Sequence, residues 1–137
     1  MVRYRFVRDL TSDVMFEAYG KSRKELFENA ALAVLEVICQ LDKVEPKTDV
    51  EVVVEGKDEK DLLFNWLQAV IAEVDIRQMF FSKVEVVDIS DKRMSAIFYG
   101  EEMVPEKGET VVKAVTYYGF SLVKGKEGYI ATVSLDI

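Results

Sequence analysis

The sequence predicts an α+β fold, a single domain over residues 1–137 with two helices packed on a mixed, largely antiparallel β-sheet. Three observations lead to this prediction. The chain has 137 residues, about the length of one domain, and 50% of them are hydrophobic, enough to build a core. Two stretches repeat apolar residues at helical spacing, whereas the other apolar stretches are short and rich in β-favouring residues. The later strands follow one another as hairpins, which favours antiparallel pairing.

The first part of the chain predicts two strands followed by a helix. The strands are expected at residues 3–7 and 14–19. Ser22 and Glu25 then have the spacing of a capping box, in which the serine hydroxyl accepts from the amide of Glu25 while the glutamate side chain reaches back. Apolar residues recur after them at intervals of three and four, the pattern of one helical face. This helix is expected to end near Gln40.

A strand at residues 50–55 precedes the second helix. Asp58 is placed to cap that helix, because an aspartate side chain accepts from the free amides of a first turn. The apolar residues that follow keep to one stripe for about four turns. Trp66 lies on this stripe, and we interpret it as a core residue because a large ring anchors a core efficiently.

The rest of the chain predicts four more strands. They are expected at residues 80–87, 93–99, 111–118 and 129–135. The polar stretch 101–110, which contains a proline and a glycine, predicts the most mobile loop. Lys113 lies in an otherwise apolar strand, and its side chain is expected to face solvent rather than to act as a buried functional amine.

Composition excludes several classes of function. The chain has no histidine, which excludes Ser-His-Asp and Cys-His catalysis as well as an imidazole metal ligand. The single cysteine, Cys39, cannot close an intrachain disulfide or form a thiolate zinc cluster, and its apolar neighbours predict a buried side chain.

Charge and hydropathy limit the partners. The 25 acidic and 18 basic residues leave a net charge of −7, which disfavours direct strong binding of nucleic acid. No apolar stretch is long enough to cross a membrane, and the first residues lack an apolar signal core. We therefore expect a soluble, cytoplasmic protein without a membrane partner.

One group of residues could bind a metal. Asp13 lies where a polar turn leads into the second strand, Asp136 directly follows the last strand, and Ile137 adds an α-carboxylate. If the last strand lies beside the second, these three carboxylates meet at one end of a sheet and repel one another unless protons or a cation neutralise them. Oxygen donors alone suit Ca²⁺, Mg²⁺ or Mn²⁺. From the residues alone, it stays open that Asp13 caps a turn and Asp136 lies in solvent.

Several short motifs occur in order along nearly the whole chain. They are Asp9-Leu10-Thr11-Ser12-Asp13-Val14 with Glu17-Ala18-Tyr19-Gly20, Glu28-Asn29-Ala30-Ala31-Leu32-Ala33, Asp42-Lys43-Val44-Glu45-Pro46-Lys47, Asp61-Leu62-Leu63-Phe64-Asn65-Trp66-Leu67, Lys113-Ala114-Val115-Thr116-Tyr117 and Leu135-Asp136-Ile137. With these motifs the sequence resembles the archease family, small acidic proteins found beside tRNA-processing enzymes. Leu10 and Tyr118 depart from the family, in which histidines are common at both positions.

The resemblance implies a non-catalytic accessory protein. Archeases activate the GTP-dependent tRNA-splicing RNA ligase, whose guanylylation and multiple turnover they promote. The family's metal site carries over to Asp13, Asp136 and Ile137, with no catalytic residue of the chain's own. On this basis we expect a divalent cation, Ca²⁺ ahead of Mg²⁺ or Mn²⁺, and the ligase as protein partner.

Two other functions stay open. One is a chaperone-like modulator of a tRNA methyltransferase or of another RNA-processing enzyme, which predicts that Met94, Phe98 or the Tyr117-Tyr118 pair lies in an exposed patch. The other is a small hydrolase with paired carboxylates. It predicts a deep pocket that holds two carboxylates with perturbed pKa values.

Overall fold

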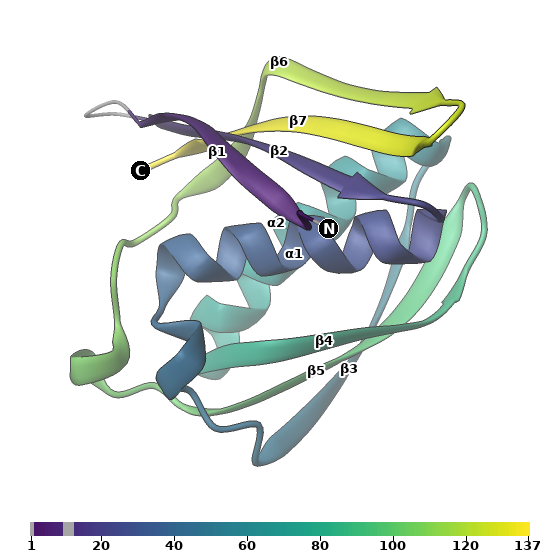
Figure 1. Ribbon diagram of the computed structural model, residues 1–137. Coiled ribbons are helices and arrows are strands. Elements are labelled where there is room, and N and C mark those ends of the chain that lie inside the picture. Colours follow the sequence, from purple (N-terminus) through teal and green to yellow (C-terminus); the bar gives the residue numbers. More distant parts are fainter. Residues whose placement is uncertain (1, 10–12) are drawn as a thin grey trace.

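Two helices lie between two β-sheets in the computed structural model, which describes residues 2–9 and 13–137 (Figure 1). The strands are β1 (Tyr4–Asp9), β2 (Asp13–Gly20), β3 (Thr48–Glu55), β4 (Met79–Ile89), β5 (Arg93–Glu102), β6 (Ala114–Gly125) and β7 (Gly128–Asp136). The helices are α1 (Arg23–Ile38) and α2 (Glu59–Arg77), with short 3-10 helices at Leu41–Lys43 and Pro105–Lys107.

The strands form one sheet on each side of the helices. The four-stranded sheet has the order β1-β2-β7-β6, the three-stranded sheet has the order β3-β5-β4, and the neighbouring strands pair antiparallel. The predicted α+β class with two helices is confirmed. The strands divide into two sheets because α1 packs against both β2 and β4, and α2 against both β6 and β3. Each helix therefore buries residues on two sides.

The helix ends follow the predicted capping. The Ser22 hydroxyl accepts from the amide of Glu25 at 3.1 Å, and the Glu25 carboxylate accepts from the amide of Lys21 at 3.2 Å. The Asp58 carboxylate accepts from the amide of Asp61 at 2.8 Å. Both helices begin where the sequence indicates, because these side chains satisfy amides that a first turn leaves free. The first helix ends at Ile38, slightly before the predicted end.

The segment before β6 differs from the prediction. Residues 111–113 were expected in a strand, but β6 begins at Ala114. The amides of Glu109 and Thr110 donate to the carbonyls of Ile38 and Val37 at 2.9 and 3.0 Å, so this segment is held against the end of α1 instead of a strand. Residues 101–110, predicted as a mobile loop, contain the end of β5 and a 3-10 helix, and the side chain of Gln40 donates to the carbonyl of Glu106 at 2.9 Å.

The core is built around Trp66. This side chain is fully buried, stacks on Phe98 at a centroid distance of 5.2 Å, and donates from Nε1 to the carbonyl of Phe27 at 2.9 Å. The hydrogen bond joins α2 to α1, and the stacking joins α2 to the three-stranded sheet. The prediction that Trp66 belongs to the core is confirmed, as is the burial of Cys39.

Helix side chains cover two of the sheet edges. The amide of Val115 on β6 donates to Gln68 of α2 at 2.9 Å, and the amide of Val86 on β4 donates to Glu28 of α1 at 2.9 Å. Edge amides that are already bonded cannot pair with a strand of another chain. The hydrogen bond to Gln68 also holds the first residues of β6 in place beside the end of β7.

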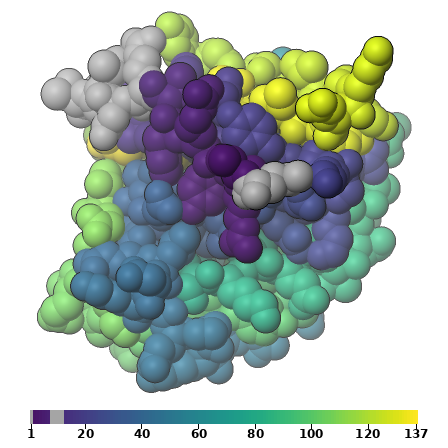
Figure 2. Space-filling view, viewed as in Figure 1, coloured from purple at the N-terminus to yellow at the C-terminus, as the bar shows by residue number. Residues whose placement is uncertain are grey.

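The four-stranded sheet carries both ends of the chain. In the space-filling view, the N-terminal strands (purple) and β7 (yellow) cover the same side of the molecule (Figure 2). Among the described residues, no helix is both long and apolar enough to span a membrane.

Candidate metal centre

The register of β2 and β7 brings two of the three predicted ligands together. Asp13, the first residue of β2, lies directly opposite Asp136, the last residue of β7. The neighbouring pair, Val14 and Leu135, is buried against the helices. Side chains alternate along a strand, so Asp13 and Asp136 both point to the outer face of the sheet. Opposed residues of an antiparallel pair have Cβ atoms about 4.5–5.5 Å apart.

The end of β7 is also held from its other side. Asp136 pairs with Ala114 of β6, and its carbonyl accepts from the amide of Lys113 at 2.8 Å. The side chain of Ile137 is partly buried against the core, which holds the residue after β7 in place. The three predicted ligand residues therefore lie at one end of the four-stranded sheet, the end marked by the C-terminus in Figure 1.

Two opposed carboxylates repel each other across the strand pair. Like charges directly opposite destabilise an antiparallel pair. Neither Asp13 nor Asp136 forms an ion pair with another described side chain. Glu17 differs from the two aspartates. It lies on the same strand and face as Asp13, but it forms an ion pair with Arg5 at 2.8 Å. A bound cation would supply to Asp13 and Asp136 the neutralisation that Arg5 supplies to Glu17.

The donor set fits a hard divalent cation. Within residues 2–9 and 13–137, no cluster of three or more His, Cys, Asp or Glu side chains could hold a metal. The described pair supplies two side-chain carboxylates, from Asp13 and Asp136, and the α-carboxylate of Ile137 stays the third ligand that the sequence predicts. Oxygen ligands without nitrogen or sulfur match Ca²⁺, Mg²⁺ and Mn²⁺.

A buried hydroxyl next to the pair was missed by the sequence reasoning. Ser134 lies two residues before Asp136 on the same face and pairs with Met15 and Thr116. It is only 1% exposed, and its Oγ has no hydrogen-bond partner among the described residues. The sequence does show one part of this arrangement. Because side chains alternate along a strand, Ser134 must lie on the same face as Asp136. An unpaired buried hydroxyl costs about 1–3 kcal/mol.

Other predicted residues are placed as follows. The exposed patch was predicted at Met94, at Phe98 or at the Tyr117-Tyr118 pair. Met94 and Phe98 are wrong for it, because alternation along β5 turns both toward the helices and buries them. Tyr117 and Tyr118 are 71% and 63% exposed. Lys113 faces solvent, as predicted. Leu10 lies outside the described residues.

Three hollows in the described surface, of about 730, 770 and 890 Å³, are lined by residues other than Asp13 and Asp136. The hollow of about 890 Å³ reaches Lys113, whose amide donates to the carbonyl of Asp136 at 2.8 Å. The alternative function, a hydrolase with paired carboxylates, predicts a deep pocket that holds two carboxylates. The carboxylates whose pKa values are depressed, Glu17 and Glu101, are those hydrogen-bonded by Arg5 and Lys107, respectively. Their environments are those of structural ion pairs.

These features define a class of small α+β protein in which two helices lie between antiparallel sheets and paired carboxylates stand at the end of an open sheet face. Comparison with known proteins identifies the family. The model of the Archease protein family (MTH1598/TM1083) matches residues 4–137. The chain belongs to the archease family, and the resemblance noted from its motifs is confirmed.

Individual relatives match over nearly the whole length. An archease of Sulfolobus acidocaldarius is 38% identical over 140 residues, covering 100% of both chains. An archease of Sulfurisphaera tokodaii is 39% identical, covering 93% of this chain and 94% of its own. The solution structure of protein 1598 of Methanobacterium thermoautotrophicum superposes with a TM-score of 0.81 at 30% identity, covering 98% of this chain and 99% of that one.

A more distant structure supports the fold alone. The crystal structure of an archease from Thermotoga maritima, described as a possible chaperone, superposes with a TM-score of 0.68 at 19% identity, covering 97% of each chain.

Proposed function

We propose that this chain is a metal-dependent accessory protein that activates the tRNA-splicing RNA ligase by promoting its guanylylation and multiple turnover. The observation that carries the proposal is the opposition of Asp13 and Asp136 at an open sheet end, in a chain that belongs to the archease family. The chain acts on the ligase and has no catalytic residue of its own.

The carboxylates of Asp13, Asp136 and Ile137 hold the divalent cation, and Ca²⁺, Mg²⁺ and Mn²⁺ all match their oxygen donors. When bound, the cation would neutralise two of the three carboxylate charges at this end of the sheet. The strand pairing fixes the two aspartates before any ion arrives, because both belong to the β2–β7 ladder. This backbone pairing supports a site that needs little rearrangement when a cation binds.

Docking is favoured by charge. The net charge of −7 suits a partner whose surface is basic because it binds RNA, and complementary fields speed the encounter of two proteins. The acidic sheet end then meets the ligase near its nucleotide and metal site, and helps to reset that site for guanylylation.

The test is multiple-turnover ligation by the purified ligase of the same organism, with and without this protein. Asp13→Asn and Asp136→Asn, and a chain extended beyond Ile137, should each lose the stimulation and bind Ca²⁺ at least tenfold more weakly by calorimetry. Glu51→Gln is the matched control, since Glu51 is an exposed carboxylate on β3 of the opposite sheet. Full stimulation by both aspartate variants would overturn the metal-dependent mechanism.

A second candidate function is a chaperone-like modulator of a tRNA methyltransferase or other RNA-processing enzyme. The observation that favours it is the exposure of Tyr117 and Tyr118. This function predicts that the aspartate variants keep full activity toward the partner enzyme. The same set of variants therefore separates the two functions.

A further inference from the structure

The β6 strand leaves its register with β7 directly beside the carboxylate pair. Thr116 pairs with Ser134 and Ser121 pairs with Thr132, so residues 117–120 of β6 face a single residue of β7. A bulge of this kind changes the direction of side chains and is often found beside functional sites. Here it turns two tyrosines toward solvent.

The two tyrosines are unusually exposed for aromatic residues. Tyr117 and Tyr118 have 71% and 63% of their surface accessible. Phe120, the last residue of the bulge, points inward and is buried. The bulge thus places one aromatic side chain in the core and two outside, although a sequence with β-strand alternation would not predict this arrangement.

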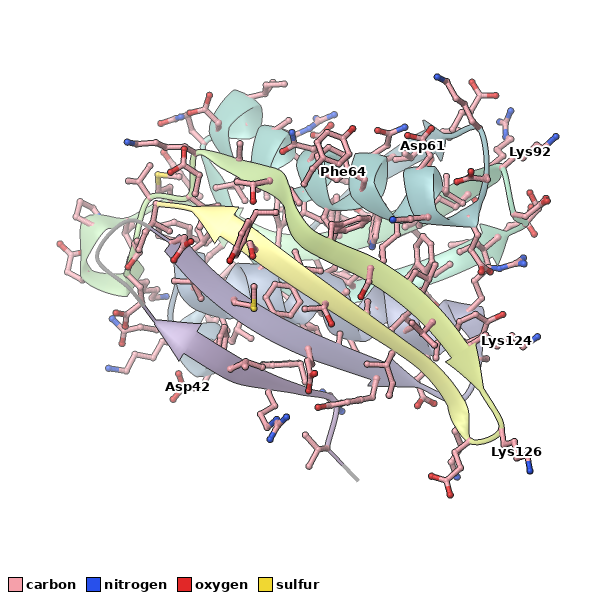
Figure 3. The ribbon with its side chains drawn as sticks, turned by 90° about the horizontal axis from the view of Figure 1, so that it is seen from above. Asp42, Asp61, Phe64, Lys92, Lys124 and Lys126 are labelled. Atoms are coloured by element: carbon pink, nitrogen blue, oxygen red, sulfur yellow. The ribbon has the colours of Figure 1, made fainter. Side chains whose placement is uncertain are left out.

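Aromatic contacts with α2 hold the bulge in position. The ring of Tyr117 stacks on the buried ring of Phe64 at a centroid distance of 4.0 Å with the planes 2° apart, and Phe120 packs edge-on against Phe64 at 5.3 Å. Figure 3 shows Phe64 on α2 next to the edge of β6. Tyr117 is therefore held in one orientation with its other face open, so that binding there costs little side-chain entropy.

The bulge also folds back over the outer face of the sheet. Gly119 has φ +64°, a conformation that residues with side chains rarely adopt, and a Cβ on it would lie 3.2 Å from the terminal methyl of Met15. Met15 is two residues from Asp13 on the same face of β2. The bulge therefore follows Thr116, whose partner Ser134 lies two residues before Asp136, and it reaches over the strand that begins at Asp13.

We propose that Tyr117 and Tyr118, together with the Asp13–Asp136 pair, form a docking surface for an arginine-bearing basic surface of a partner protein. The proposal rests on the function proposed above, in which that partner is the RNA ligase. A guanidinium group matches both parts of the surface, because it stacks on tyrosine faces and forms paired hydrogen bonds with a carboxylate.

The charges exclude a phosphate backbone as the preferred occupant. Three carboxylates at the sheet end carry −3 and a divalent cation leaves −1, so the surface attracts a guanidinium with or without the metal. Exposed tyrosines over such a surface are typical of residues that dominate the binding energy of protein interfaces.

The experiment measures the affinity of the purified ligase for variants of the full chain by biolayer interferometry. Tyr117→Ala and Tyr118→Ala should each weaken binding about tenfold, while Tyr117→Phe and Tyr118→Phe retain it because the ring is kept. Val53→Ser is the control for the loss of an exposed apolar side chain, since Val53 is 57% exposed on the opposite sheet. Calcium affinity, measured on the same samples, should stay unchanged in the tyrosine variants.

The arginine is tested on the ligase. Each exposed arginine is replaced by lysine, which keeps the charge but not the planar group, and at least one replacement should reproduce the tenfold loss. If no arginine replacement weakens binding, the proposal is overturned.

Further outcomes are also decisive. Tyrosine variants that bind and stimulate the ligase like the original chain would overturn the docking surface and leave the proposed function standing. Failure of the original chain to bind the ligase would instead overturn both. Tight binding of tRNA alone that the tyrosine variants abolish would overturn the choice of a protein partner. A dimer by sedimentation that they abolish would overturn the choice of the ligase.

Discussion

Asp13 and Asp136, which lie near opposite ends of the chain, are directly opposed across the β2–β7 ladder, and neither is paired with a described basic side chain. Such an arrangement opposes folding in the absence of a cation and favours it in its presence. The stability of the protein should therefore depend on divalent metal in a way that can be measured without any partner.

The first prediction concerns Asp13→Asn. Removing one of two opposed charges should stabilise the metal-free protein by ~0.5 kcal/mol, a rise in Tm of about 2 °C. Calcium should raise the Tm of the original chain and have little effect on the variant, because binding to the folded state alone stabilises it. Calorimetry in EDTA and in millimolar CaCl₂ checks both points, and an identical calcium shift in the two proteins would contradict the assignment of Asp13.

The second prediction concerns Ser134→Ala. The buried hydroxyl has no partner among the described residues, so its removal should stabilise the metal-free protein by about 1 kcal/mol. Urea midpoints in EDTA measure the change, with Ser95→Ala in the opposite sheet as the control. A loss of stability would mean that the hydroxyl is hydrogen-bonded in solution.

The third prediction concerns pH. Hydrogen bonds from Arg5 and then Tyr19 hold the pKa of Glu17 below its usual range. A carboxyl whose pKa is lower in the folded state contributes stability above its unfolded pKa, and this contribution is lost as the pH falls through the folded value. The original chain should lose stability below about pH 4.3, and Glu17→Gln should lose less over the same range.

Urea midpoints at pH 7 and at pH 3.5 measure this difference. Glu51→Gln is the control, because Glu51 is exposed on the opposite sheet. Equal losses in the original chain and in Glu17→Gln would show that the Arg5–Glu17 contact contributes nothing in solution.

The sequence predicted the helices well because their signals are local. Ser22 and Asp58 cap the helices through contacts within one turn. The apolar stripes can be recognised from the spacing of the residues on one helical face. The division into two sheets depends on contacts far apart in the chain, such as α1 packing against both β2 and β4, and no local pattern encodes it.

The same distinction holds for the site. Asp13 and Asp136 were predicted as a pair on the condition that β7 lies beside β2, and the register satisfies it. Exposure of the Tyr117-Tyr118 pair was one alternative predicted for the chaperone-like function, but the bulge at residues 117–120 that causes it packs on Phe64 of another element and could not be predicted. Strand alternation could have shown that Ser134 shares the face of Asp136, but its burial is a tertiary property that no local pattern encodes.

The fourth prediction concerns Cys39. The thiol is buried among apolar residues, and burial, helped by the nearby charge of Glu109, raises its pKa to about 12. Since only the thiolate reacts, labelling by a disulfide reagent at pH 8 should be slow in the folded protein and fast in urea. Rapid labelling of the folded protein would show that the end of α1 opens readily.

The last prediction concerns Trp66→Phe. The indole Nε1 donates to the carbonyl of Phe27 at 2.9 Å, and the ring stacks on Phe98, so the side chain joins both helices to the three-stranded sheet. Phenylalanine keeps part of the ring contact but leaves the carbonyl without its donor and a gap where the second ring was. The two losses together should destabilise the protein by about 2–4 kcal/mol, measured as a lower urea midpoint with an unchanged slope. Tyr99→Phe, which removes an exposed hydroxyl and its 3.2 Å hydrogen bond to Glu85, should lie within about 0.5 kcal/mol of the original chain. If Trp66→Phe were equally mild, the indole hydrogen bond would not link the helices, and the packing of α1 on α2 would rest on the aliphatic residues alone.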